Sequence, residues 1–100
     1  MATEARPAFL AITGRFELET VAAAARFAAC VRDASGERES HPAVVACSAL
    51  AARAFGGDRE AWRPLVAAVR ALLTAAPAGD AGSRRELRAF VAENADLLEV

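Results

Sequence analysis

Only one pair of side chains in this sequence has the types that nucleophilic catalysis requires. Cys47 could act as a nucleophile and His41, the single histidine, as its base. The two residues are six positions apart at the start of an expected helix, so their side chains point about 240° apart around its axis. We therefore expect Cys47 to lie in the core and His41 to have a surface or helix-capping role. No catalytic residue is assigned, and the chain is expected not to be an enzyme.

Metal and phosphate chemistry have no matching pattern in the sequence. A metal site needs several His, Cys, Asp or Glu side chains at ligand spacing, whereas Cys30 and Cys47 are seventeen positions apart and no CxxC, HxxxH or ExxH motif occurs. Gly56 and Gly57 lack the following Lys and Ser/Thr of a phosphate-binding loop. We expect no metal and no cofactor.

The order of charges along the last expected helix is the clearest candidate for a functional feature. Arginines stand near its positive N-terminal end and acids near its negative C-terminal end, the reverse of what the helix dipole favours. Each misplaced exposed charge costs about 0.3–1 kcal/mol, and such a pattern is self-complementary for two antiparallel copies of the helix. It predicts a C2 homodimer. The residues are Arg84, Arg85 and Arg88 at one end and Glu93, Asp96 and Glu99 at the other.

Trp62 is the single tryptophan and is flanked by Arg59 and Arg63. Tryptophan and arginine are favoured anchors of protein interfaces. The spacing of Trp62 from Leu65 and Leu73 also fits a place in the core, so both interpretations stay open. The candidate partner-binding residues are therefore Arg59, Trp62, Arg63, Arg84, Arg85, Arg88, Glu93 and Asp96.

Composition predicts the fold class. Of 100 residues, 28 are alanine and 12 are arginine, and lysine, tyrosine and glutamine are absent. Alanine has the highest helix propensity because it loses no side-chain entropy in a helix. The bias is also typical of a GC-rich bacterial coding sequence. We predict one all-α domain over residues 1–100, an antiparallel up-and-down bundle of four main helices with residues 1–13 as an N-terminal arm or a short fifth helix.

Apolar residues recur at spacings of three and four over four segments, which predicts helices at about 15–34, 40–55, 58–73 and 83–98. The first helix carries one apolar stripe that includes Phe27 and a second stripe beside it. The second helix is apolar almost all round and is expected to be the most buried element. The second stripe of the first helix consists of Leu18, Val21, Ala25 and Ala28.

The ends of the expected helices carry recognisable capping residues. Ser40 is the expected N-cap of the second helix and Asp58 that of the third. Ser83 and Glu86 form a capping-box pattern that predicts the start of the fourth. Pro64 is tolerable only in the first turn, so the third helix should start late or kink there.

The net charge of the chain and the length of its apolar stretches limit the cellular compartment and the classes of partner that we expect. A net charge of −1 is too balanced for a general nucleic-acid or membrane-surface binder, and one asparagine with no glutamine leaves little for base readout. The longest uncharged apolar stretch, residues 42–52, is too short to span a membrane, and the first residues make a poor secretory signal. We expect a cytoplasmic protein with two buried thiols.

The leading hypothesis is a non-enzymatic helical interaction module, an adaptor or self-associating protein that binds a protein partner or a second copy. The alternative is a small hydrophobic-ligand-binding protein or accessory subunit of a biosynthetic pathway. Its pocket would lie between helices, and a DNA-associated regulator is a weaker third option. The pocket would be lined by alanines and by Phe16, Phe27, Phe55 and Phe90.

Overall fold

The computed structural model describes residues 20–75 and 79–98, with side chains from Ala23 onward. Every regular element in that part of the chain is a helix, which confirms the all-α class and the four main helices. Residues 1–13, expected as an arm or fifth helix, and the expected helical residues 15–19 lie outside the described residues. The elements are α2 (Thr20–Ser35), α3 (Pro42–Phe55), η2 (Arg59–Ala61), α4 (Trp62–Ala75), α5 (Ala81–Glu93) and η3 (Ala95–Leu98).

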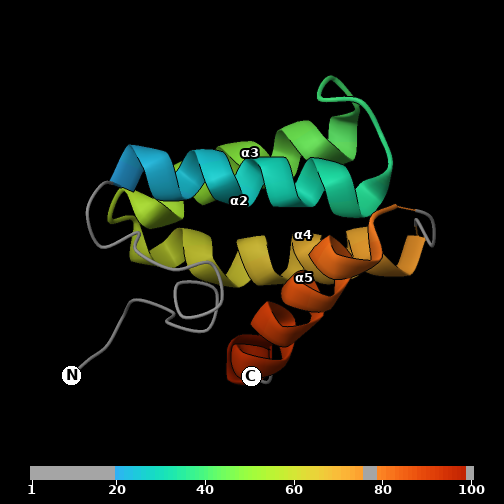
Figure 1. Cartoon of the computed structure of the whole chain (residues 1–100). Coiled ribbons are helices and arrows are strands. Elements are labelled where there is room, and N and C mark those ends of the chain that lie inside the picture. Colours follow the sequence, from blue (N-terminus) through green and yellow to red (C-terminus); the bar gives the residue numbers. More distant parts are fainter. Residues whose placement is uncertain (1–19, 76–78, 99–100) are drawn as a thin grey trace.

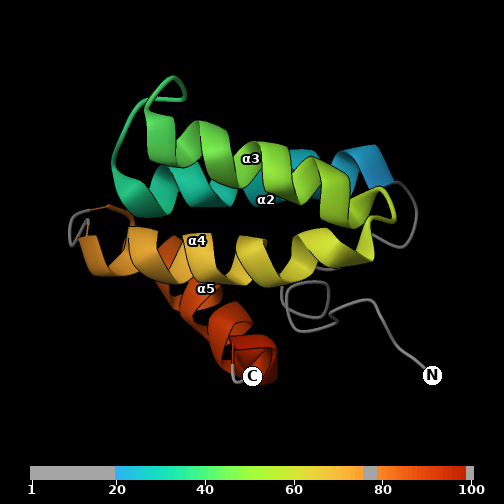
Figure 2. The ribbon, with the colours of Figure 1, turned by 180° about the vertical axis from the view of Figure 1, so that it is seen from behind.

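The helices are arranged in two layers (Figure 1). Helices α2 and α3 run antiparallel and form one layer, and α4 runs back beneath them. Helix α5 leaves the end of α4 and descends obliquely across it, as the opposite view also shows (Figure 2). Helix α5 lies at an angle to the other three (Figures 1 and 2) and packs against both α2 and α4.

Aromatic side chains from all four main helices meet in the core. The Phe27 ring lies 5.0 Å from that of Phe90 and 5.6 Å from that of Phe55, centroid to centroid. The Phe55 ring in turn meets the Trp62 ring at 5.2 Å, edge to face, an arrangement that aromatic pairs favour. Since these residues come from α2, α5, α3 and α4 respectively, the cluster fixes how the helices pack.

Burial separates the two apolar stripes expected on the first helix. The stripe that contains Ala23, Phe27 and Val31 is buried, as expected. In the second stripe Ala25 is exposed and Ala28 is half-buried. Among the described side chains of α2, the apolar ones in the core therefore belong to the first stripe.

The expectation that the second helix is the most buried element is wrong. Helix α3 buries one side, whereas Val45, Ala46, Ala49 and Ala52 on its other side are exposed. The physical reason is its place in the outer layer, where it packs against α2 and α4. Because alanine adds little area, a helix can be apolar all round without being enclosed.

Two helix starts follow the expected capping chemistry with one shift. The N-cap of α3 is His41 and not Ser40: its Nδ1 accepts from the Ala43 amide at 3.1 Å, which confirms a capping role for the histidine. Asp58 accepts from the Glu60 amide at 3.1 Å and caps η2, as expected. Helix α4 begins at Trp62, which places Pro64 in its first turn, where no amide hydrogen is needed.

The capping box expected at Ser83 and Glu86 is wrong, because α5 starts at Ala81. Asp80 is the N-cap, and its carboxylate accepts from the Ser83 amide at 2.9 Å. This amide hydrogen bond holds the pKa of Asp80 below its usual value. Helix α5 ends at Asn94, whose buried amide donates to the Phe90 carbonyl at 2.7 Å. The expected helix 83–98 is therefore α5 followed by η3.

Candidate interaction surface

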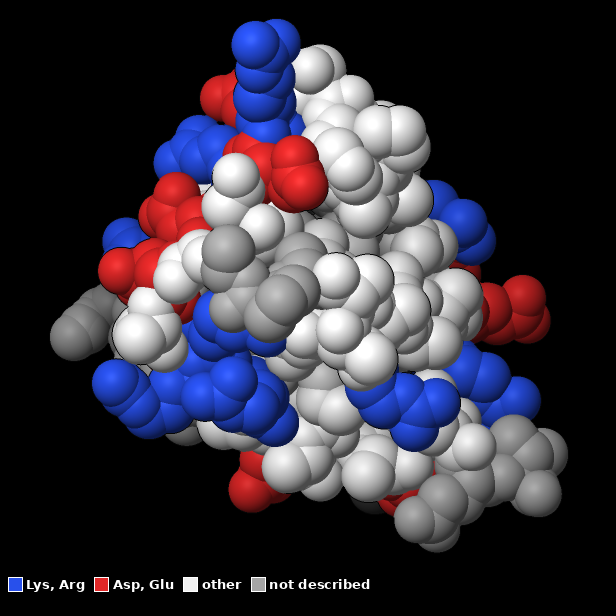
Figure 3. All heavy atoms as spheres, turned by 90° about the vertical axis from the view of Figure 1, so that its right-hand side faces the viewer, with Lys and Arg blue, Asp and Glu red and all other residues white. Residues whose placement is uncertain are grey.

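The charged residues predicted on the last helix are mostly at the surface. Arg85, Arg88, Glu93 and Asp96 are all exposed. Figure 3 shows the end of the molecule where α4 ends and α5 begins: basic side chains cluster at the lower left, acidic ones lie above them, and uncharged ones cover the upper right. Within residues 20–75 and 79–98, neither Arg85 nor Arg88 forms an ion pair.

Arg84 has a different environment from its two neighbours. Its Nη1 donates to the Ala34 carbonyl at 2.9 Å and its Nη2 to the Leu73 carbonyl at 2.7 Å. These carbonyls belong to the last turns of α2 and α4, which carry the negative ends of both helix dipoles and lack helical partners. The cation that is unfavourable for its own helix therefore stabilises the ends of two others. These two hydrogen bonds explain the position of one of the three misplaced arginines without requiring a partner protein.

The remaining predicted residues do not form one patch with α5. Trp62 is buried, 7% exposed, in the aromatic cluster, so its core placement is the one observed. Arg59 and Arg63 are exposed at the start of α4. Helix α5 starts beyond the other end of α4, which has 14 residues and is therefore about 20 Å long. The structure places the two groups of arginines at opposite ends of that helix.

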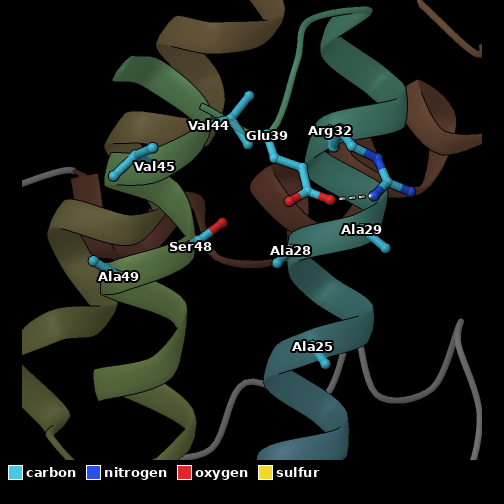
Figure 4. Close-up of a pocket in the computed structure, with 9 residues that line it drawn as sticks. All are labelled: Ala25, Ala28, Ala29, Arg32, Glu39, Val44, Val45, Ser48 and Ala49. Atoms are coloured by element: carbon cyan, nitrogen blue, oxygen red, sulfur yellow. Dashed lines mark hydrogen bonds and ion pairs between the residues drawn. The ribbon is translucent and has the colours of Figure 1, made fainter. Parts of the chain in front are cut away.

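An open groove lies between α2 and α3, on the side facing away from α4 and α5 (Figure 4). Its volume is ≈ 610 Å³. Val45 on its wall is 51% exposed, and within the described segments no other large hydrophobic residue is classed as exposed. An ion pair between Arg32 Nη1 and Glu39 Oε2, 3.3 Å apart, closes one end. The groove is lined by Ala25, Ala28, Ala29, Arg32, Glu39, Val44, Val45, Ser48 and Ala49.

None of the candidate partner-binding residues named from the sequence lines this groove. Two patterns in the sequence nevertheless correspond to its walls. The second stripe of α2 supplies Ala25 and Ala28 to one wall, and the apolar outer side of α3 supplies Val45 and Ala49 to the other. Each pattern also fits burial within the chain, because neither shows that α2 and α3 form an outer layer.

The phenylalanines expected to line a ligand pocket instead fill the core. Phe27 and Phe90 are both 0% exposed, and their rings pack against each other. Phe55 packs on Phe27, and Phe16 lies outside the described residues. The alanine-lined space between helices exists, but its walls contain none of these rings.

The cysteines are buried thiols, and neither forms a disulfide. Burial, followed by the nearby charge of Glu86, raises the pKa of Cys30 from its ordinary 9.0 to about 12. Its Sγ lies 3.7 Å from a carboxylate oxygen of Glu86. Burial raises the pKa of Cys47 to about 11. These raised pKa values keep both thiols protonated at neutral pH, and the Nδ1 of His41 accepts from the Ala43 amide instead of facing a thiol.

These pKa shifts predict a loss of stability at alkaline pH. Above pH 9 the thiols of the unfolded chain lose their protons while the native thiols keep theirs, so the free energy of unfolding should fall as pH rises from about 9 towards 12. With no lysine or tyrosine in the sequence, few other side chains titrate in this range. Urea unfolding at about pH 8 and pH 10.5 measures the effect.

The double variant Cys30→Ala, Cys47→Ala is the control for this prediction. It should be less stable than the wild type at about pH 8, because it leaves two small cavities. Its stability should change much less between the two pH values. An equally steep decline in the double variant would assign the alkaline sensitivity to other groups.

Among the described residues, no three His, Cys, Asp or Glu side chains are grouped as a metal site would require. No helix in residues 20–75 and 79–98 has the length and hydropathy of a membrane span. Comparisons with protein-family models, curated proteins and solved structures found no match.

Proposed function

We propose that this chain is a non-enzymatic helical interaction module that associates with a second copy of itself through the groove between α2 and α3. The observation that carries the proposal is the groove itself, an apolar surface between two helices with Val45 exposed on its wall. Contiguous exposed apolar surface on a small domain is typical of an interaction site. Alanine walls would let the helices of a partner approach closely, since small side chains set a short interaxial distance.

The alternative dimer through α5 has a weaker physical basis. The exposed side of α5 offers Arg85, Arg88 and Glu93, with Ala81 and Ala92 as its apolar residues. Exposed ion pairs contribute about 0.2–1 kcal/mol each. Association costs about 4–15 kcal/mol in lost translational and rotational freedom. With Asp96 of η3 included, two copies could form four such pairs, about 0.8–4 kcal/mol in all. That sum does not exceed even the lower end of the cost, whereas buried apolar surface contributes about 25 cal/mol per Å².

The charges around the groove favour a second copy as its occupant. The central lining residues are uncharged, and the two charged ones, Arg32 and Glu39, lie together at one end and neutralise each other. An antiparallel two-fold pairing would place this end opposite the Ala25 end of the other copy. Among the residues that line the groove, no like charges would then face each other. Each copy would offer both Val45 and the groove that receives it, as an isologous interface requires.

The size of the surface predicts a weak dimer. Helix α3 has 14 residues, so the α2–α3 face is about 20 Å long and about 20 Å wide. Two such faces would bury roughly 800 Å² in total, below the ~1,200–2,000 Å² of stable complexes. We therefore expect a dissociation constant of about 10–500 μM.

The hydrophobic-ligand alternative is less well supported by the groove. Binding pockets enclose about 70–90% of a ligand, whereas Ala25, Val45 and Ala49 on the groove walls are themselves exposed. A flat helical surface suits such an open site better than a small molecule does. Marked thermal stabilisation by a hydrophobic metabolite, lost in Val45→Glu, would favour the ligand instead.

Sedimentation equilibrium from about 5 to 500 μM tests the proposed dimer. We expect Val45→Glu to raise the dissociation constant at least about tenfold, because the carboxylate would have to be desolvated in the interface. Ala92→Glu on α5 is the matched control and should leave it within about twofold. High salt should not weaken an apolar dimer.

Three results would contradict the proposal. The first is a strict monomer at the highest concentration. The second is a dimer that Val45→Glu leaves intact. The third is a dimer that Ala92→Glu and salt disrupt, which would move the interface to α5. Circular dichroism of each variant checks that it has folded, and since both residues are exposed we expect no change.

A further inference from the structure

A row of arginines follows the outer side of α4 and is separate from the groove. Arg63 and Arg70 are seven positions apart, which puts them within about 20° of each other around the helix axis. Arg59 precedes them in η2, four positions before Arg63. All three are exposed, and α4 itself contains no acidic residue. The row is therefore a basic edge that runs from η2 to the middle of α4.

These arginines differ from others that the fold already uses. Arg53 donates to Asp58 at 2.8 Å, and Arg32 pairs with Glu39. Within the segments that the structure describes, Arg59, Arg63 and Arg70 form no ion pair. Glu60 is the one acid of η2 and α4 together, so the surface keeps a net positive charge. Positive charge that no acid of the described segments pairs with is available to an acidic partner.

We propose that Arg59, Arg63 and Arg70 form a docking surface for an acidic helical segment of a partner protein. A helix laid along α4 with carboxylates four and seven positions apart repeats the intervals of the row. Arginine suits this role because its planar guanidinium binds a carboxylate through two parallel hydrogen bonds. Exposed Pro64 and Ala71 on the same helix add small apolar contacts.

Chemistry on the same surface argues for a protein rather than a nucleic acid. Single strands are held by exposed aromatic rings that stack on bases, whereas Phe27, Trp62 and Phe90 are buried. Three cations on a chain of net charge −1 give little phosphate neutralisation. The one asparagine, Asn94, is buried and bonded to its own helix, so base edges would lack a reader.

The arginine row and the groove lie in different layers of the molecule. The groove opens on the side of α2 and α3 that faces away from α4 (Figure 4), and the exposed side of α4 lies in the opposite layer (Figures 1 and 2). Self-association through the groove would leave both arginine rows accessible. Docking on α4 does not require the dimer, and each can fail without the other.

A fluorescently labelled helical peptide tests the surface by anisotropy at low salt. The probe is alanine-based and carries glutamates at intervals of four and seven, and its control carries glutamines at the same positions. We expect only the acidic peptide to bind. Loss of one exposed ion pair changes affinity by at most about fivefold. The charge reversal Arg63→Glu also adds a repulsion between carboxylates, so it should weaken binding at least about tenfold. Arg38→Glu, in an exposed loop, should change it less than about twofold.

The outcomes that would overturn the proposal are distinct. Equal affinity for the acidic and glutamine peptides, or undetectable binding of both, removes the acidic partner. Unchanged binding in Arg63→Glu moves the site away from α4. Tighter binding of an oligothymidine than of the acidic peptide, lost in Arg63→Glu, assigns the row to nucleic acid. Because Arg63 is exposed, the variant is expected to fold, and Arg70→Glu provides an independent repeat.

Discussion

Replacing Gly79 with alanine is expected to lower the free energy of unfolding by about 3 kcal/mol or more. Gly79 has φ = 120°, a conformation that L side chains rarely adopt. An added Cβ would lie 2.1 Å from the Ala34 carbonyl oxygen and 2.9 Å from that of Asp33. Neither oxygen can withdraw at low cost, because the first accepts from Arg84 and the second from the Asp80 amide at 2.8 Å.

The matched control is Gly57→Ala. Gly57 also has a positive φ, 109°, but an added Cβ would have no atom within 4 Å. This variant should lose only the cost of the backbone conformation, about 1–2 kcal/mol. Urea denaturation followed by circular dichroism gives both values. Similar losses in the two variants would show that the close approach of Gly79 to α2 adds nothing beyond its backbone angle.

The sequence predicts the parts of this fold in which large side chains repeat. Phe27 and Val31 on α2, and Leu65 and Val69 on α4, are buried where their spacing placed them. Their size makes exposure costly, so their positions define the core face. Alanine gives no such definition. A face of α3 made of alanines has nearly the same pattern whether it is enclosed or open, which is why its burial was overestimated.

Of the three expected N-caps, Ser40, Asp58 and Ser83, the one observed is Asp58. Asp58 caps the next turn as expected because only two positions separate it from the amide it accepts from. At α5 two plausible caps, Asp80 and Ser83, lie three positions apart. Asp80 is held at the start of the helix by a contact that is distant in sequence: its amide donates to the Asp33 carbonyl of α2. Sequence periodicity holds no information on that pairing.

The candidate surfaces show the same limit. The exposed charges of Arg85 and Arg88 follow from the helical spacing, but the contacts of Arg84 join residues 50 positions apart. The groove likewise depends on which helices share a layer. The charge order marked the start of α5 as a partner surface, which stays a prediction for Arg85 and Arg88. It could not supply the position of the ends of α2 and α4 beside that helix, where Arg84 donates.

Replacing Arg84 with alanine is the second large effect that we expect. The guanidinium donates to the last turns of both α2 and α4, and hydrogen bonds from a charged donor contribute about 1.5–3 kcal/mol each. Because the side chain is partly exposed, water replaces part of each bond. We expect a loss of about 2–4 kcal/mol in the free energy of unfolding. Arg84→Lys should recover about half of it, since one ammonium replaces a two-armed fork.

Arg85→Ala separates this structural role from a general effect of charge at the start of α5. Arg85 is exposed, and its removal should change stability by no more than about 0.5 kcal/mol, with a small gain possible because a cation leaves a positive helix end. If Arg84→Ala were equally harmless, the bonds to the Ala34 and Leu73 carbonyls would not hold the layers together. If Arg85→Ala kept full stability but weakened self-association, the reversed charges of α5 would serve recognition, and the interface would belong there and not in the groove.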